Sequence, residues 1–162
     1  MNMETGPGSL RPGSLRIALL VARFNSMITE QLLEGARRRL LARGLAMDDI
    51  GVVYVPGAWD LPQAARRIAN SQRYDAIVAL GCVIRGETAH FDYVAGHASD
   101  GLGQVALTAG IPVVFGVLTT DNGEQAMLRA NAYGMDRGGE FAQSVLDMLS
   151  LFASHPEGPE GS

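Results

Sequence analysis

The chain has 162 residues, of which 47% are hydrophobic and 19% charged, a composition typical of one globular domain in solution. Its net charge of −4 and its lack of an extended basic cluster argue against a nucleic-acid partner. A single cysteine excludes an internal disulfide and a thiolate zinc site, and no apolar run is long enough to span a bilayer, so we expect a soluble, cytoplasmic protein.

Stretches rich in glycine, proline and serine predict flexible tails at residues 1–14 and 153–162, around one domain at 15–152. The first predicted strand covers residues 16–22, and its apolar residues on both faces indicate a buried parallel sheet. A helix with a stop at Gly44 follows. Its predicted buried stripe consists of Ile28, Leu32, Ala36 and Leu40.

The alternation of strand and helix continues along the domain. Asp60 and Asp121 are predicted helix caps, since each has Gln or Glu three positions later. A further helix begins near His90 and carries apolar residues at helical spacing as far as Val105. The other predicted strands cover residues 52–55, 75–80 and 112–117, and the other helices cover 60–70, 121–129 and 138–152.

Four strand–helix units and an extra C-terminal helix predict an α/β fold, with a parallel sheet between two helical layers. In such a sheet the segments that follow the strands all emerge at one edge, where ligands bind. We therefore expect a ligand site at this edge, built from Phe24, residues 56–60, residues 81–90 and residues 119–120.

The segment 81–90 is the most informative part of the chain. It is predicted to be a turn with two glycines, a cation, hydroxyl and carboxyl groups, and a histidine at the start of a helix. Free N–H groups at a helix start favour anions. The segment indicates a small enzyme that acts on a phosphorylated or otherwise anionic substrate.

Each polar candidate also has an ordinary structural interpretation. His90 titrates in the range needed for acid–base work, but a lone histidine in a first helical turn is more often an ordinary polar residue. Gly86, Glu87 and Thr88 are equally suited to hold a phosphate or simply to start a helix. Arg129 has the guanidinium fork that grips phosphate, yet arginine near a helix end commonly complements the helix dipole.

The remaining candidates are similarly ambiguous when taken singly. Asp60 is suited to accept hydrogen bonds from a polyol or to cap its own helix. Phe24, Trp59 and Phe115 offer stacking surfaces or ordinary packing. Cys82 is interpreted as a small buried residue rather than a nucleophile. Their predicted convergence on one edge of the sheet is what makes them worth considering together.

Taken together, these segments resemble the lumazine synthase family over roughly residues 15–151. The motifs that carry the resemblance are A-R-F-N-S-M-I-T (22–29), V-P-G-A-W-D-L-P (55–62), G-C-V-I-R-G-E-T-A-H-F-D-Y-V (81–94), F-G-V-L-T (115–119), E-Q-A-M-L-R-A (124–130) and D-R-G-G-E (136–140). The resemblance implies a flavodoxin-like three-layer sandwich, with a four-stranded parallel sheet and helices on both faces.

In that family, 5-amino-6-(D-ribitylamino)uracil condenses with 3,4-dihydroxy-2-butanone 4-phosphate to give 6,7-dimethyl-8-ribityllumazine, phosphate and water, in riboflavin biosynthesis. The resemblance implies no metal or organic cofactor, and it implies that His90 transfers protons. The residues implied to bind ribitylaminouracil are Phe24, Ala58, Trp59, Asp60, Cys82, Val83, Ile84 and Phe115. Those implied to bind butanone phosphate are Gly86, Glu87, Thr88 and Arg129, with Arg137 as an auxiliary residue.

The resemblance also implies a homo-oligomer built on pentamers, with riboflavin synthase as a candidate partner. Phe115 and Arg129 would reach each site from the neighbouring subunit. Three features depart from the family's pattern: Asp60 replaces the more frequent glutamate, Arg137 replaces lysine, and the connection 131–136 is short but lacks some usual glycines. Pentamer, decamer and icosahedral shell therefore all stay open.

Two other classes of protein compete with the enzyme. A non-catalytic relative that binds flavin or lumazine, or forms a cage, would be expected to lose His90, Arg129 or the turn at 86–88, and all are present. A generic flavodoxin-like signalling or cofactor module would need an acidic cluster at the strand ends or a glycine-rich phosphate loop after the first strand. The sequence has neither, so the enzyme is favoured.

Overall fold

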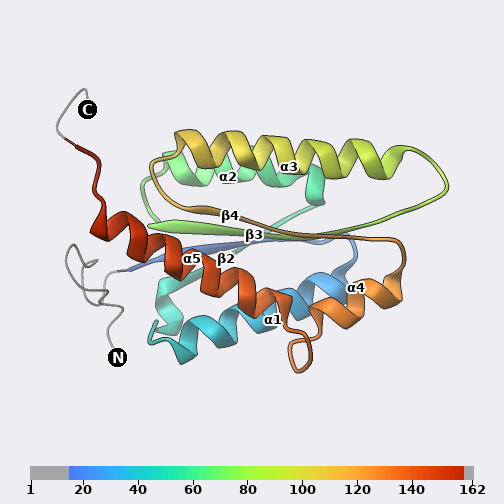
Figure 1. Ribbon diagram of the computed structural model, residues 1–162, viewed down its shortest axis with the longest axis horizontal. Coiled ribbons are helices and arrows are strands. Elements are labelled where there is room, and N and C mark those ends of the chain that lie inside the picture. The colour runs from blue at the N-terminus through green and yellow to red at the C-terminus, as the bar shows by residue number, and fades with distance from the viewer. Residues whose placement is uncertain (1–14, 159–162) are drawn as a thin grey trace.

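The computed structural model describes residues 15–158, so the predicted N-terminal tail and residues 159–162 lie outside the described residues. The described chain forms a parallel sheet with strand order β2-β1-β3-β4, placed between two layers of helices (Figure 1). This arrangement confirms the predicted three-layer α/β fold. The strands are β1 (Ile17–Ala22), β2 (Ile50–Val55), β3 (Ala76–Ile84) and β4 (Val113–Thr120).

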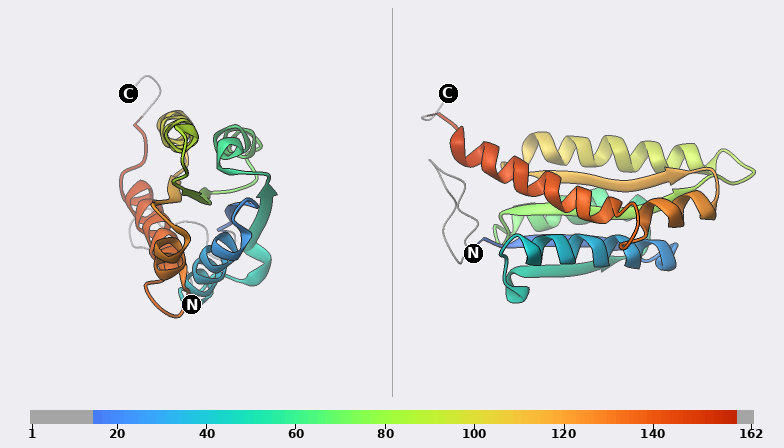
Figure 2. Two further views of the ribbon diagram at one scale, coloured as in Figure 1. Left: turned by 90° about the vertical axis from the view of Figure 1, so that its right-hand side faces the viewer. Right: turned by 60° about the horizontal axis from the view of Figure 1, so that its bottom comes forward.

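The helices cover both faces of the sheet. One layer consists of α2 (Leu61–Asn70) and α3 (His90–Thr108), and the other of α1 (Ser26–Ala42), α4 (Gly123–Ala130) and α5 (Arg137–Ser154) (Figure 1). Two short 3-10 helices, η1 (Met47–Asp49) and η2 (Ala58–Asp60), flank β2. Because all strand pairs are parallel, the carboxyl ends of the strands share the edge that faces the viewer in Figure 2, left.

Central strand β1 is buried on both faces, as its apolar sequence predicts. Ile17, Leu19 and Val21 pack toward α1 and α5. Ala18, Leu20 and Ala22 pack toward α2 and α3. The predicted stripe of α1 is buried as well, so two apolar cores hold the sheet rigid beneath its carboxyl edge. No helix in the range 15–158 is both long and apolar enough to cross a membrane.

Strands β3 and β4 are longer than predicted. Gly81 was predicted to open a turn, but it lies inside β3 and pairs with Val117. Thr119 and Thr120 were expected to follow the last strand, but they lie inside β4. Glycine weakens a strand only moderately, and the continuous ladder with β4 outweighs that weakness. The turn before α3 therefore begins only at Arg85.

Of the two predicted helix caps, Asp60 holds the N-cap position of α2 without a side-chain capping bond, and Asp121 is not the cap of α4. The Asp60 carboxylate makes no capping bond to α2 and instead accepts the Gly57 N–H at 3.1 Å. Asn122, not Asp121, caps α4, its side-chain oxygen accepting the Gln125 N–H at 2.8 Å. Neighbouring Asp and Asn residues are both good caps, so spacing alone cannot choose between them.

Glycines lie where helices α1 and α5 pack against each other. A Cβ atom on Gly138 would collide with the Leu32 backbone oxygen, and one on Gly35 would collide with the Asp136 carboxylate. That carboxylate caps α5, since its Oδ1 accepts the Gly139 N–H at 3.0 Å, and its Oδ2 lies 3.5 Å from Arg39 Nη2. The start of α5 is therefore held against α1 by backbone contact and by charge.

We expect Gly138→Ala to lower the free energy of unfolding by about 1–3 kcal/mol, because the added methyl group must push α5 away from α1. Chemical denaturation followed by circular dichroism, at one protein concentration for all variants, measures this change. The matched control is Gly103→Ala, since Gly103 is exposed in α3 and its Cβ would meet no atom within 4 Å. That control should be neutral or stabilising by up to about 1 kcal/mol; equal stability of Gly138→Ala and the wild type would contradict the close-packing argument.

Candidate active site

A cavity of about 800 Å³ lies at the carboxyl edge of the sheet, within the size range usual for small-molecule sites. Its walls come from the segments after β1 and β2, the end of β3, and the first turns of α3. The predicted site residues that line it are Phe24, Ala58, Trp59, Asp60, Cys82, Val83, Ile84, Gly86, Thr88 and His90. The structure thus brings together most of the residues that the sequence singled out.

The turn between β1 and α1 is tied to the neighbouring strands by hydrogen bonds. The Phe24 N–H donates to the Pro56 carbonyl at 3.0 Å, and the Asn25 side-chain amide donates to the Cys82 carbonyl at 2.9 Å. Asn25 has φ 64°, a left-handed conformation that asparagine tolerates better than most residues. Phe24 is held at the cavity with 71% of its surface exposed. Sequence reasoning assigned Asn25 no role, although an asparagine directly before a helix is a signal for such a turn.

The second wall is the short helix η2. Ala58 is buried, and the bond from the Gly57 N–H to the Asp60 carboxylate closes the turn. Trp59 lines the cavity, is 52% exposed, and stacks on His97, with ring centroids 3.7 Å apart and planes at 24°. Sequence reasoning gave His97 no role in the site, because nothing in the spacing places η2 against α3.

The end of β3 forms the floor of the cavity, with Cys82, Val83 and Ile84 in the lining. Burial raises the pKa of the Cys82 thiol to about 11, so the thiol is protonated at neutral pH. A protonated buried thiol is a poor nucleophile. The structure therefore supports the interpretation of Cys82 as a small buried residue.

The turn between β3 and α3 presents unused backbone donors. The N–H groups of Gly86, Glu87 and Thr88 make no hydrogen bond within the described chain, while the His90 N–H donates to the Thr88 hydroxyl at 3.3 Å. A Cβ atom on Gly86 would meet nothing within 4 Å, and its φ is not in the left-handed region. Neither packing nor backbone conformation thus requires this glycine, and the open space beside the N–H groups suits a close-approaching anion.

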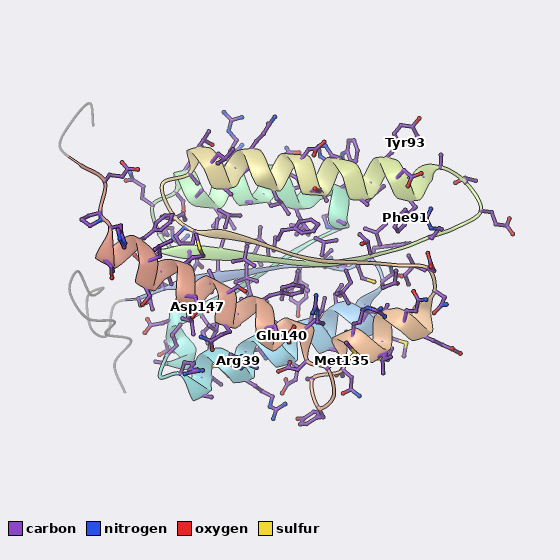
Figure 3. All side chains as sticks on the ribbon, in the orientation of Figure 1. Arg39, Phe91, Tyr93, Met135, Glu140 and Asp147 are labelled. Atoms are coloured by element: carbon purple, nitrogen blue, oxygen red, sulfur yellow. The ribbon has the colours of Figure 1, made fainter. Side chains whose placement is uncertain are left out.

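Arg85, the cation in this turn, is held by two carboxylates and an aromatic ring. Arg85 Nε lies 3.1 Å from Asp121 Oδ1, its Nη1 lies 3.9 Å from Asp92 Oδ1, and its guanidinium lies 4.4 Å from the centre of the Phe91 ring. Phe91 lies between α3 and the sheet (Figure 3), and both Phe91 and Tyr93 line the cavity. Among the described residues, no arginine or lysine lines the cavity, so its charged groups are Asp60 and, when protonated, His90.

Four predicted site residues do not line this cavity in the single chain. Glu87 lies in the turn but is exposed. Phe115 lies on edge strand β4 and is 40% exposed. Arg129 Nη1 donates to the Gln125 carbonyl at 3.1 Å on α4, and Arg137 pairs with Glu140 at 3.0 Å on α5.

The arrangement suits binding of a planar polar ring and an anion side by side. Aromatic side chains and strand backbone flank one part of the cavity, and free N–H groups and a histidine flank the other. Within residues 15–158, no group of three or more His, Cys, Asp and Glu residues is placed to hold a metal ion.

Comparison with known protein families agrees with this geometry. The profile of the 6,7-dimethyl-8-ribityllumazine synthase family matches residues 14–153, a span that contains every strand and nearly all of α5. The match covers all the motifs that suggested the resemblance, and the fold agrees with it. The chain therefore belongs to the 6,7-dimethyl-8-ribityllumazine synthase family, a family of transferase-type enzymes in riboflavin biosynthesis.

Proposed function

We propose that the protein condenses 5-amino-6-(D-ribitylamino)uracil with 3,4-dihydroxy-2-butanone 4-phosphate, releasing phosphate and water and forming 6,7-dimethyl-8-ribityllumazine. The observation that carries this proposal is the position of His90, which lines the same cavity as the aromatic wall and lies next to the turn with the free N–H groups. A ring substrate and a phosphate substrate would then meet next to a group that can exchange protons.

The ribitylaminouracil is assigned to the part of the cavity near β1 and β2. The exposed Phe24 ring offers a face for the pyrimidine, and the end of β3 offers backbone groups to its polar edge. Trp59 and Asp60 are assigned to the ribityl chain. Because one Asp60 oxygen already accepts the Gly57 N–H, the other oxygen is the one available to a ribityl hydroxyl.

The butanone phosphate is assigned to the turn before α3. The three free N–H groups at 86–88 and the positive end of the α3 dipole suit a phosphate. These groups do not balance a phosphate dianion, since Arg85 is paired with Asp121 and no arginine or lysine within residues 15–158 lines the cavity. We assign the missing cation to Arg129 of a neighbouring subunit, in an assembly built on pentamers in which Phe115 also reaches across.

The chemistry needs proton transfers but no covalent bond to the protein. The aryl amine attacks the ketone carbonyl and water leaves, giving an imine; elimination then breaks the C–O bond to phosphate. Loss of phosphate leaves an enol, which tautomerises to a ketone at the former hydroxyl-bearing carbon. The ribitylamino nitrogen closes the ring on this new carbonyl, and a second water leaves. His90 can donate and accept the protons of these steps in turn, and holding both substrates in one cavity supplies much of the acceleration.

We expect purified protein to form the lumazine from the two substrates well above the uncatalysed rate. His90→Ala should lower kcat by about tenfold to a hundredfold, a modest loss for a proton-transfer residue because proximity remains. Absorbance of the lumazine product, with the background subtracted, measures the rate. A wild-type rate equal to background would refute the enzyme and leave a protein that binds flavin or lumazine without turnover.

Gly86→Ala tests the phosphate position separately from the fold. The new methyl group meets no protein atom within 4 Å, so we expect an unchanged Tm. It would project beside the free N–H groups, so we expect KM for the butanone phosphate to rise at least about tenfold, with KM for ribitylaminouracil nearly unchanged. The control is Gly96→Ala, which also has open space around its Cβ and does not line the cavity. Equal effects on both Michaelis constants would contradict the assignment.

Mixed assemblies test whether Arg129 acts across subunits. Arg129→Ala and His90→Ala chains should each be impaired alone. After denaturation and refolding of an equal mixture, about a quarter of the sites would combine an intact His90 with a neighbour's intact Arg129, restoring about a quarter of wild-type activity. Activity no higher than the mean of the two separate variants would show that both residues must come from one chain.

A further inference from the structure

The stacked pair of Trp59 and His97 is a direct contact between the cavity wall and helix α3. Their ring centroids lie 3.7 Å apart with an interplanar angle of 24°, which is a parallel aromatic contact rather than an edge contact. Trp59 lines the cavity, and His97 does not. The imidazole therefore supports the indole without itself forming part of the cavity lining.

His97 lies on α3 two helical turns after His90, and residues seven apart lie on the same face of a helix. Between these turns, Val94 lines the cavity. One face of α3 thus serves the site in two ways: its first residue lines the cavity directly, and His97 in its third turn contacts the indole that lines another part of the cavity.

A close helix contact brings His97 to Trp59. A Cβ atom on Gly101 would lie 2.7 Å from Pro62 Cβ and 3.9 Å from His97 Cε1. The absence of that side chain lets α3 approach the start of α2, and the short helix η2, which carries Trp59, directly precedes α2. The rigid packing of α3 on α2 therefore determines the distance between the two rings.

We propose that His97 is a positioning residue, which holds the Trp59 indole as the wall against the ribityl-bearing substrate. This inference rests on the proposed function for its substrate. Trp59 is 52% exposed, and its neighbours Ala58 and Asp60 are held by burial and by the bond to Gly57. The backbone of η2 is thus fixed, while the indole depends on His97 for its ring contact. Ordering the indole in advance lowers the entropic cost of closing it on a flexible polyol.

Tryptophan fluorescence tests the contact without any turnover, because Trp59 is the chain's only tryptophan. His97→Ala should lower the fluorescence anisotropy and raise the acrylamide quenching constant, as the indole gains freedom and exposure. His97→Phe should keep both near the wild-type values, since a phenyl ring can stack in the same place. Ser99→Ala, an exposed change two residues along α3, is the control. Unchanged anisotropy and quenching in folded His97→Ala protein would overturn the proposal.

Steady-state kinetics then test whether the contact serves the substrate. His97→Ala should raise KM for ribitylaminouracil about twofold to tenfold, the range expected from one aromatic contact. KM for butanone phosphate and kcat should change less than twofold. His97→Phe should restore KM for ribitylaminouracil to near the wild-type value. Equal changes in both Michaelis constants, or no rescue by His97→Phe, would overturn the positioning role. If the wild type has no turnover, the proposed function fails, whereas the fluorescence result still decides whether His97 orders Trp59.

Discussion

The pairing of β3 with β1 on one side and β4 on the other is the constraint on which the site depends. β3 continues to Ile84 because its ladder with β4 continues to Thr120. That extension places the Cys82 carbonyl where Asn25 can donate to it, which ties the turn carrying Phe24 to the sheet. It also determines where α3 begins, since only five residues separate Ile84 from His90. Strand register thus sets the distance from the aromatic wall to the histidine.

Much of the fold could be predicted because its signals are local and repeated. The apolar strand β1 and the four-residue stripe of α1 were read correctly, and both are buried. The errors lie where two local rules compete. Gly81 is a turn former by type, yet a neighbouring strand extends the ladder through it. Asp121 and Asn122 are both good caps, and the salt bridge from Arg85 leaves the capping position to Asn122.

The cavity was predictable as a location but not as a set of contacts. Parallel topology brings the ends of β1, β2 and β3 to one edge, so residues such as Phe24, Trp59 and His90 were expected together, and they line one cavity. The contact between Trp59 and His97 was not predictable, because it depends on how closely α3 packs on α2 at Gly101 and Pro62. Helical spacing places His97 on a face of α3, but it does not say which loop lies against that face.

The charge of the cavity gives the strongest physical reason to expect a shared site. A phosphate dianion at the start of α3 would meet free N–H groups and a helix dipole, which are worth far less than a paired guanidinium. The turn's own arginine cannot turn inward without abandoning Asp121 and the Phe91 ring. Arg129, by contrast, makes only one bond, to a carbonyl on its own helix, and can exchange it at little cost. A single chain thus provides N–H donors for a phosphate, but Arg85, the cation in the same turn, is paired with Asp121. A neighbouring chain that presents Arg129 would supply the missing positive charge, and Arg85 would keep its contacts with Asp121 and Phe91.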